Sequence, residues 1–78
     1  MVVKKKVKDK VEYFSHIEIG EAFMLMYNTD VYIKITNHIN AEDKVEINSV
    51  NLITGEIEWF APYTSVFKVR ATIEIEEN

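Results

Sequence analysis

"INSVNLITGEIEWF", residues 47–60, contains the only tryptophan of the chain and one of its two glycines. The Thr-Gly pair at 54–55 indicates a turn, because glycine takes a positive φ without steric cost. A loop of even length there gives a hairpin whose facing residues are apolar, and such cross-strand pairs stabilise a sheet. The predicted pairs, which form the inner face of the hairpin, are Leu52 with Ile57 and Val50 with Trp59.

The apolar alternation changes its facing inside this stretch. Val45 and Ile47 occupy odd positions, whereas Val50 and Leu52 occupy even positions, so the inward face changes between Asn48 and Ser49. An extra residue there, as a β-bulge or bend, would restore the inward direction and curve the strand. Small barrels require such curved strands.

Most of the chain outside this stretch also alternates with a period of two, and β-branched and aromatic residues are abundant. This pattern predicts an all-β domain rather than a helical one. A five-stranded, partly open barrel of the SH3-like kind is the first expectation, and an OB-like barrel is the alternative. The five strands are predicted near residues 21–27, 31–37, 44–53, 56–60 and 65–75.

The first predicted hairpin has a three-residue loop at residues 28–30. This loop puts the apolar residues of both strands on one side, whereas a two-residue loop would oppose Phe23 with Thr36 and Leu25 with Lys34. The pairs predicted by the three-residue loop are Phe23 with Ile35, Leu25 with Ile33 and Tyr27 with Val31. The opposite face then carries Met24, Met26, Tyr32 and Lys34.

The two ends of the chain allow alternatives. Residues 1–13 are either a disordered basic arm or an additional edge strand protected by lysines, because their apolar residues share parity. Residues 14–78 form one domain, in which Phe14 and Ile17 are expected to plug one end of the barrel. The last strand, near 65–75, is long. It either pairs with two parts of the sheet in turn or projects its end toward a neighbouring subunit.

Charge is divided unevenly along the chain. Residues 1–10 hold five lysines and one aspartate, whereas residues 11–78 hold four basic and twelve acidic residues, a net charge of −8. An acidic body repels phosphate backbones, which disfavours nucleic-acid binding and suits a basic partner surface. A nucleic-acid accessory function would rest on weak, salt-sensitive contacts made by the N-terminal lysines alone. These are Lys4, Lys5, Lys6, Lys8 and Lys10.

Catalytic and metal-binding patterns are missing from the sequence. There is no cysteine, so disulfides and thiolate metal sites are excluded. His16 and His38 fall in different predicted loops, without the spacing of metal ligands. Carboxylates that share a strand face lack an apolar cleft that would raise a pKa, so a solvated face is expected rather than an enzyme, a cofactor or a metal. These carboxylate pairs are Glu56 with Glu58 and Glu74 with Glu76.

No segment predicts a membrane span or a signal peptide. The longest apolar run, residues 22–27, is far shorter than a membrane-spanning helix. The lysine-rich start has no apolar region behind it. A soluble protein that remains in the cytoplasm is therefore expected.

Three motifs resemble those of a loose group of small, largely uncharacterised bacteriophage proteins. The motifs are "IGEAF" (19–23), "VYIKI" (31–35) and "NSVNLITGEIEWF" (48–60), followed by Pro62 and Val66. Proteins of the group have a G-E-x-F strand, a V-Y-I-K strand and then N-A-V-N-L-x-T-G-E, with alanine where this chain has Ser49. The resemblance covers residues 14–69. It implies a viral origin, action in the cytoplasm of a bacterial host, and no catalytic residues to carry over.

The sequence therefore favours a noncatalytic protein that binds a host or phage protein. The face opposite the predicted core is the first candidate surface, because methionine and tyrosine suit adaptable contacts. In the alternative arrangement, the N-terminal segment or the last strand covers that face. The small size of the domain favours this alternative. A homo-oligomeric structural protein, assembled through the long last strand, is the alternative function. The candidate binding residues are Met24, Met26 and Tyr32 on the opposite face, and Phe60 and Tyr63 beside the proline.

Overall fold

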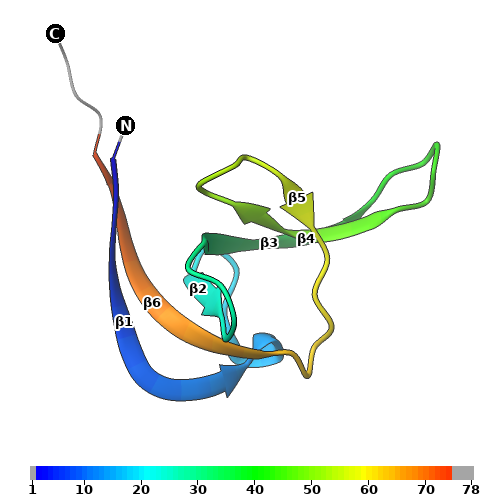
Figure 1. Cartoon of the computed structure of the whole chain (residues 1–78). Coiled ribbons are helices and arrows are strands. Elements are labelled where there is room, and N and C mark those ends of the chain that lie inside the picture. Colours follow the sequence, from blue (N-terminus) through cyan, green and yellow to red (C-terminus); the bar gives the residue numbers. More distant parts are fainter. Residues whose placement is uncertain (1, 75–78) are drawn as a thin grey trace, which may run out of the picture.

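The computed structural model describes the backbone of residues 2–74 and the side chains of residues 10–70. One antiparallel sheet has the strand order β1-β6-β2-β3-β4-β5, and it curves without closing, with β1 and β5 at its edges (Figure 1). The prediction of an all-β domain is confirmed, with one strand more than expected. The elements are β1 (Val2–Tyr13), the 3-10 turn η1 (Phe14–His16), β2 (Ala22–Leu25), β3 (Val31–Ile39), β4 (Glu46–Asn51), β5 (Ile57–Glu58) and β6 (Ser65–Glu74).

The additional strand is β1, which is the edge-strand alternative for residues 1–13. It pairs with β6 from Val2 opposite Glu74 to Tyr13 opposite Ser65, with an irregularity at residues 8–10. The other edge of β6 pairs with β2, but only between Val66 and Val69. The long last strand therefore has two neighbours along its first half, and beyond Val69 it continues with β1 as a two-stranded ribbon that leaves the body of the domain (Figure 1).

Two similar irregularities bend the long strands. Residues 35–37 of β3 lie opposite Asn48 alone, because the register shifts between the pair Lys34–Ser49 and the pair His38–Ile47. Residues 8–10 of β1 lie opposite Lys68 alone in the same way. The extra residue predicted between Asn48 and Ser49 is therefore not in β4, and the extra residues belong to its partner β3, opposite Asn48. Bulges of this kind increase the local bend of a sheet.

The predicted register of the first hairpin is wrong. Phe23 lies opposite Tyr32 and Met24 opposite Val31, so the connection is longer than the three residues expected. All four residues of β2 are buried, so the strand is covered on both faces. In a strand that is covered on both faces, apolar and polar residues need not alternate, because either face can accept an apolar side chain. The sequence pattern of such a strand therefore does not select one pairing register.

The predicted register of the second hairpin is shifted by two residues. Val50 pairs with Ile57 instead of Trp59, and the loop consists of residues 52–55. The Asn51 side chain holds this loop, because its Oδ1 accepts hydrogen bonds from the backbone N–H groups of Ile53 at 2.8 Å and Thr54 at 3.1 Å. The alternation predicts Ile57 and Trp59 on the inner face, but their side chains are exposed.

The core is divided between the two faces of the sheet. One cluster contains Phe14 and Ile17, as predicted, together with the aromatic rings around Phe23. Ring centroids lie 5.3 Å from Phe23 to Phe14 and 5.5 Å from Phe23 to Tyr32. The buried members of this cluster are Phe14, Ile17, Phe23, Leu25, Tyr32 and Val66. The cluster on the other face consists of Ala22, Met24, Val31 and Val69, covered by Leu52 and Phe67.

Replacement of Phe23 by alanine tests this division. Phe23 is fully buried at the centre of the aromatic cluster. Phe23→Ala is expected to lower the free energy of unfolding by about 3–5 kcal/mol in urea titrations, because a buried phenyl ring is replaced by a cavity. Tyr27→Ala, at a side chain that is 83% exposed, is the control and should change the free energy by no more than about 0.5 kcal/mol. Equal effects of the two variants would contradict the described packing.

Candidate functional site

An open groove lies on the aromatic side of the sheet, between η1 with the loop after it, β3 and the connection that follows β5. Its volume is about 380 Å³. The side chains of Ile19 and Trp59 at the groove are 64% and 47% exposed, whereas the Phe14 ring is buried. The groove is lined by Phe14, Ser15, Ile19, Lys34, Ile35, Asn37, Asn48, Trp59, Phe60 and Pro62. We refer to it as the aromatic groove.

One wall of the aromatic groove is set by the buried amide of Asn48. Its Nδ2 donates a hydrogen bond to the backbone carbonyl of Phe60 at 2.9 Å, and its Oδ1 accepts one from the backbone N–H of Phe60 at 2.9 Å. β5 ends at Glu58, so the amide side chain takes the place of a strand partner two residues further along. The backbone around Phe60 is therefore held against β4 by a side chain rather than by backbone hydrogen bonds between strands.

This double hydrogen bond determines which aromatic residue of the pair 59–60 turns inward. The Phe60 ring packs on the core, with centroids 5.2 Å from Tyr32 and 5.6 Å from Phe23. The neighbouring Trp59 side chain is left at the surface. The sequence pattern predicts Trp59 inward and Phe60 outward, so the prediction is reversed here. The reason is that a side-chain hydrogen bond, rather than strand pairing, sets the facing at these positions.

The opposite wall is set by Lys34. Its Nζ donates hydrogen bonds to the carbonyl oxygens of Phe14 at 3.2 Å and Ile17 at 2.8 Å, and it lies 4.4 Å from the centroid of the Phe14 ring. These contacts hold η1 against β3. The backbone N–H of Ser15 also donates to the carbonyl of Pro62 at 2.9 Å, so the two walls are joined directly. A groove built in this way is preformed.

The side chains around the groove suit noncovalent binding rather than bond chemistry. The lining is apolar apart from a hydroxyl, two amides and the Lys34 ammonium, which two carbonyl groups already hold. Among the described residues, no three side chains of His, Cys, Asp or Glu gather in a way that could hold a metal ion. Within the same residues, no helix is long and apolar enough to cross a membrane.

Two ionisable side chains near the core have shifted pKa values. The pKa of Tyr32 is raised, mainly because burial disfavours the phenolate, and Glu58 acts in the same direction. The amide of Asn28 donates a hydrogen bond to the Tyr32 hydroxyl at 3.3 Å and opposes this shift. The pKa of Lys68 is raised by its hydrogen bond to Glu21, whose Oε2 lies 2.6 Å from Nζ.

The first predicted binding surface is not a surface in the structure. Met24 and Tyr32 are buried, and they lie on opposite faces of the sheet, in the two different core clusters. Met26 is exposed in the turn after β2. The assumption that these three residues share an exposed face is wrong, because the register of the first hairpin differs from the predicted one. The alternative, in which that face is covered, describes Met24 and Tyr32 correctly.

The other predicted residues are placed differently. Phe60 lines the aromatic groove, and Tyr63 is 78% exposed beyond Pro62. The N-terminal lysines lie on β1, where Lys10 is exposed. The side chains of Lys4, Lys5, Lys6 and Lys8, and both carboxylates of the pair Glu74 and Glu76, lie outside the described side chains. His16 and His38 are both exposed, but His38 lies in β3 rather than in the loop predicted for it, and His16 lies in η1.

The sequence-based prediction misses the residues that form the groove walls. The alternation marks Asn48 only as the place where the facing changes, and Lys34 only as a member of the polar face. A buried asparagine inside an apolar strand needs hydrogen-bond partners, and that requirement is the available signal. Ile19 carries no signal, because a single exposed apolar residue is common at protein surfaces.

Replacement of Asn48 tests the construction of the groove. Asn48→Ala leaves the N–H and carbonyl of Phe60 without their partners, and it should lower the free energy of unfolding by about 2–3 kcal/mol. Asn37→Ala is the control, because the amide of Asn37 is exposed and its contact with Glu46 is 3.5 Å long. Its effect should stay within about 0.5 kcal/mol. Denaturant titrations that find the two variants equally stable would disprove the role given to Asn48.

Stability at alkaline pH provides a second test. The pKa of Tyr32 is higher in the folded than in the unfolded chain, so its contribution to stability is full below pH about 10 and is lost as the pH rises through the folded pKa. Tyr32→Phe should therefore show a smaller alkaline loss of unfolding free energy than the wild type. The pKa of Lys68 is also raised, so its contribution to the unfolding free energy is lost at alkaline pH as well. This loss is the same in both proteins and cancels when their profiles are compared. Identical pH profiles for the two proteins would contradict the burial of the phenol.

Comparison with known proteins adds no family. No protein-family model matches the chain, and neither a curated protein nor a solved structure gives a significant match. The resemblance to small bacteriophage proteins therefore remains a prediction from three short motifs.

Proposed function

We propose that this protein is a noncatalytic binding protein that holds an extended segment of another protein in the aromatic groove. The observation that supports the proposal is the exposure of Trp59 beside a preformed apolar groove. Tryptophan and tyrosine dominate the binding energy of many protein interfaces, and Tyr63 lies close by in the sequence. Open grooves lined by aromatic residues are a common way to bind extended peptides.

The charges around the groove favour a basic partner. Glu58 precedes Trp59, Glu18 precedes Ile19, and the Glu46 carboxylate accepts a hydrogen bond from Asn37 in the lining. Among the described residues that line the groove, Lys34 is the one cation, and its ammonium is engaged with two carbonyl groups. A segment with an apolar or aromatic side chain between lysines or arginines would match both the groove and its acidic surroundings.

The setting of this function is proposed from the motifs. A phage-encoded protein acting in the cytoplasm of a bacterial host would have host or phage proteins as its partners. An SH3-like barrel is the architecture we propose for the curved, open sheet, with an OB-like barrel as the alternative. Lys10, the N-terminal lysine whose side chain is described, does not line the groove.

Selection from a library of random peptides, displayed in extended form, tests the proposal with a defined probe. Recovered peptides should share an apolar or aromatic residue flanked by basic residues. Trp59→Ala should weaken their binding about 30-fold or more, as expected for a central aromatic residue of an interface. Tyr27→Ala, which removes an aromatic side chain outside the lining, should leave the affinity unchanged. Binding can be followed by titration calorimetry.

Two results would contradict the proposal. One is a selection that yields no shared pattern. The other is a peptide that binds Trp59→Ala and the wild type with equal affinity. Retention of the protein on nucleic acid, abolished by removal of residues 1–10, would instead support the nucleic-acid alternative.

A further inference from the structure

The distal half of β6 has one paired edge and one open edge. Its β1 partner continues to the end of the described strand, where Val2 lies opposite Glu74. Its β2 partner ends with Ala22 opposite Val69. Within the described part of the chain, residues 70–74 therefore have no strand neighbour on the β2 side. Figure 1 shows this half of the β1–β6 ribbon leaving the body of the domain.

Pairing of a further strand with this open edge would stabilise the ribbon. A two-stranded ribbon by itself is marginally stable in water, and a third and fourth strand make it stable. Residues 70–74 contain no lysine and no proline, and their register with β1 is regular from Lys6–Arg70 to Val2–Glu74. The outer edge of β1 differs, because it carries the N-terminal lysines and the irregularity at residues 8–10, which are devices that block edge pairing.

The sequence of the open edge is complementary to itself. We propose that a second copy of this chain pairs with it in the antiparallel direction, around a two-fold axis at Thr72. Arg70 of each copy then lies opposite Glu74 of the other, and Ala71 lies opposite Ile73. Opposite charges across neighbouring strands favour pairing. In an interface with two-fold symmetry, both copies use the same edge, so no such edge is left open and assembly stops at the dimer.

The position of the two-fold axis at Thr72 follows from the extent of the open edge. It is the one antiparallel register in which all five open positions, 70–74, pair with one another, and the pairing ends where β2 begins. Directly opposite residues share a face of the sheet, so the same register aligns the apolar positions of both copies on one face of a β1-β6-β6-β1 sheet. Those positions in each copy are Val3, Val7, Val69, Ala71 and Ile73, and the position opposite Ala71 on the same face is Lys5.

Charge reversal tests the register. The wild type is expected to be a dimer in sedimentation equilibrium, and its dissociation constant should rise with salt because the paired charges are screened. Arg70→Glu sets two carboxylates opposite each other at both ends of the paired segment, and Glu74→Arg sets two guanidinium groups opposite each other there. Each single variant should weaken the dimer about tenfold or more. The double variant Arg70→Glu/Glu74→Arg restores opposite charges and should recover the wild-type constant within about threefold.

The variants also carry their own control for folding. Arg70 lies opposite Lys6 of its own β1, so Arg70→Glu places opposite charges across the ribbon inside each copy. Thermal unfolding followed by circular dichroism should therefore show folded single variants. A wild type that stays monomeric at millimolar concentration would overturn the proposal. A dimer whose dissociation constant is the same in all four proteins would also overturn it, because the copies would then meet through another surface.

Discussion

The two hydrogen bonds between the Asn48 side chain and the backbone of Phe60 are the constraint on which the aromatic side of this domain depends. β5 is two residues long and could not by itself position the connection that follows it. The Asn48 amide presents one donor and one acceptor, as a backbone peptide does, and it holds the backbone of Phe60 through two hydrogen bonds of 2.9 Å. Phe60 can then close the ring cluster over Phe23 while Trp59 stays in contact with water.

The same constraint explains why a groove forms here at all. Phe60 and η1 both approach the sheet over β3, and the hydrogen bonds from Lys34 and to Pro62 fix the distance between them. None of these polar groups is free to adapt, because each is engaged with the backbone. A partner of the proposed kind would therefore meet a groove whose walls are already fixed, and little affinity would be lost to ordering of the protein.

Alternation predicts where the strands lie better than it predicts which of their residues pair. Alternation predicts a strand at residues 65–75, and β6 runs from Ser65 to Glu74. The registers of both hairpins fail for physical reasons. β2 is buried on both faces, so its parity selects no partner. At residues 47–60 the asparagine side chains replace backbone pairing, and alternation does not describe such contacts. The exposure of Trp59 could not be predicted for the same reason, since its facing follows from Asn48.

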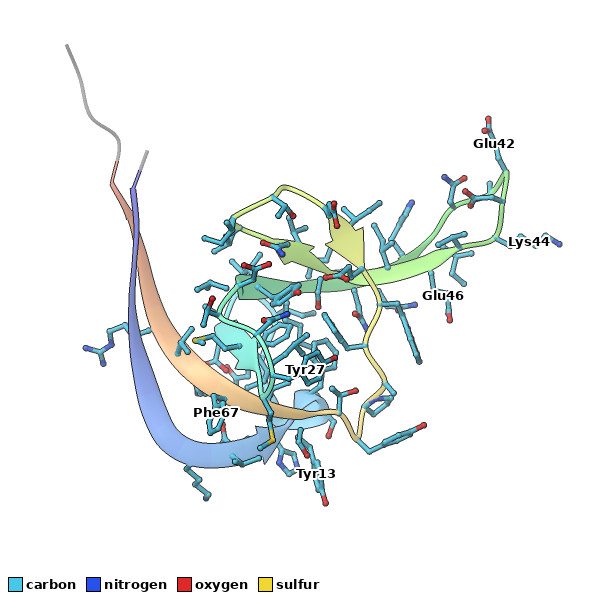
Figure 2. The ribbon with its side chains drawn as sticks, in the orientation of Figure 1. Tyr13, Tyr27, Glu42, Lys44, Glu46 and Phe67 are labelled. Carbon is cyan, nitrogen blue, oxygen red and sulfur yellow. The ribbon has the colours of Figure 1, made fainter. Side chains whose placement is uncertain are left out.

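The two proposed surfaces belong to different parts of the molecule, and this separation has a consequence for binding. The aromatic groove is built by η1, β3 and the segment around Phe60, whereas the open edge of β6 lies on the ribbon that leaves the body (Figure 1). The hairpin of β3 and β4, with Glu42 and Lys44 at its tip, projects in yet another direction (Figure 2). The proposed antiparallel pairing at Thr72 would set the two bodies on opposite ends of the joined sheet. The dimer would thus present two identical grooves at a fixed spacing, so a partner with repeated sites at that spacing gains avidity that a single site does not.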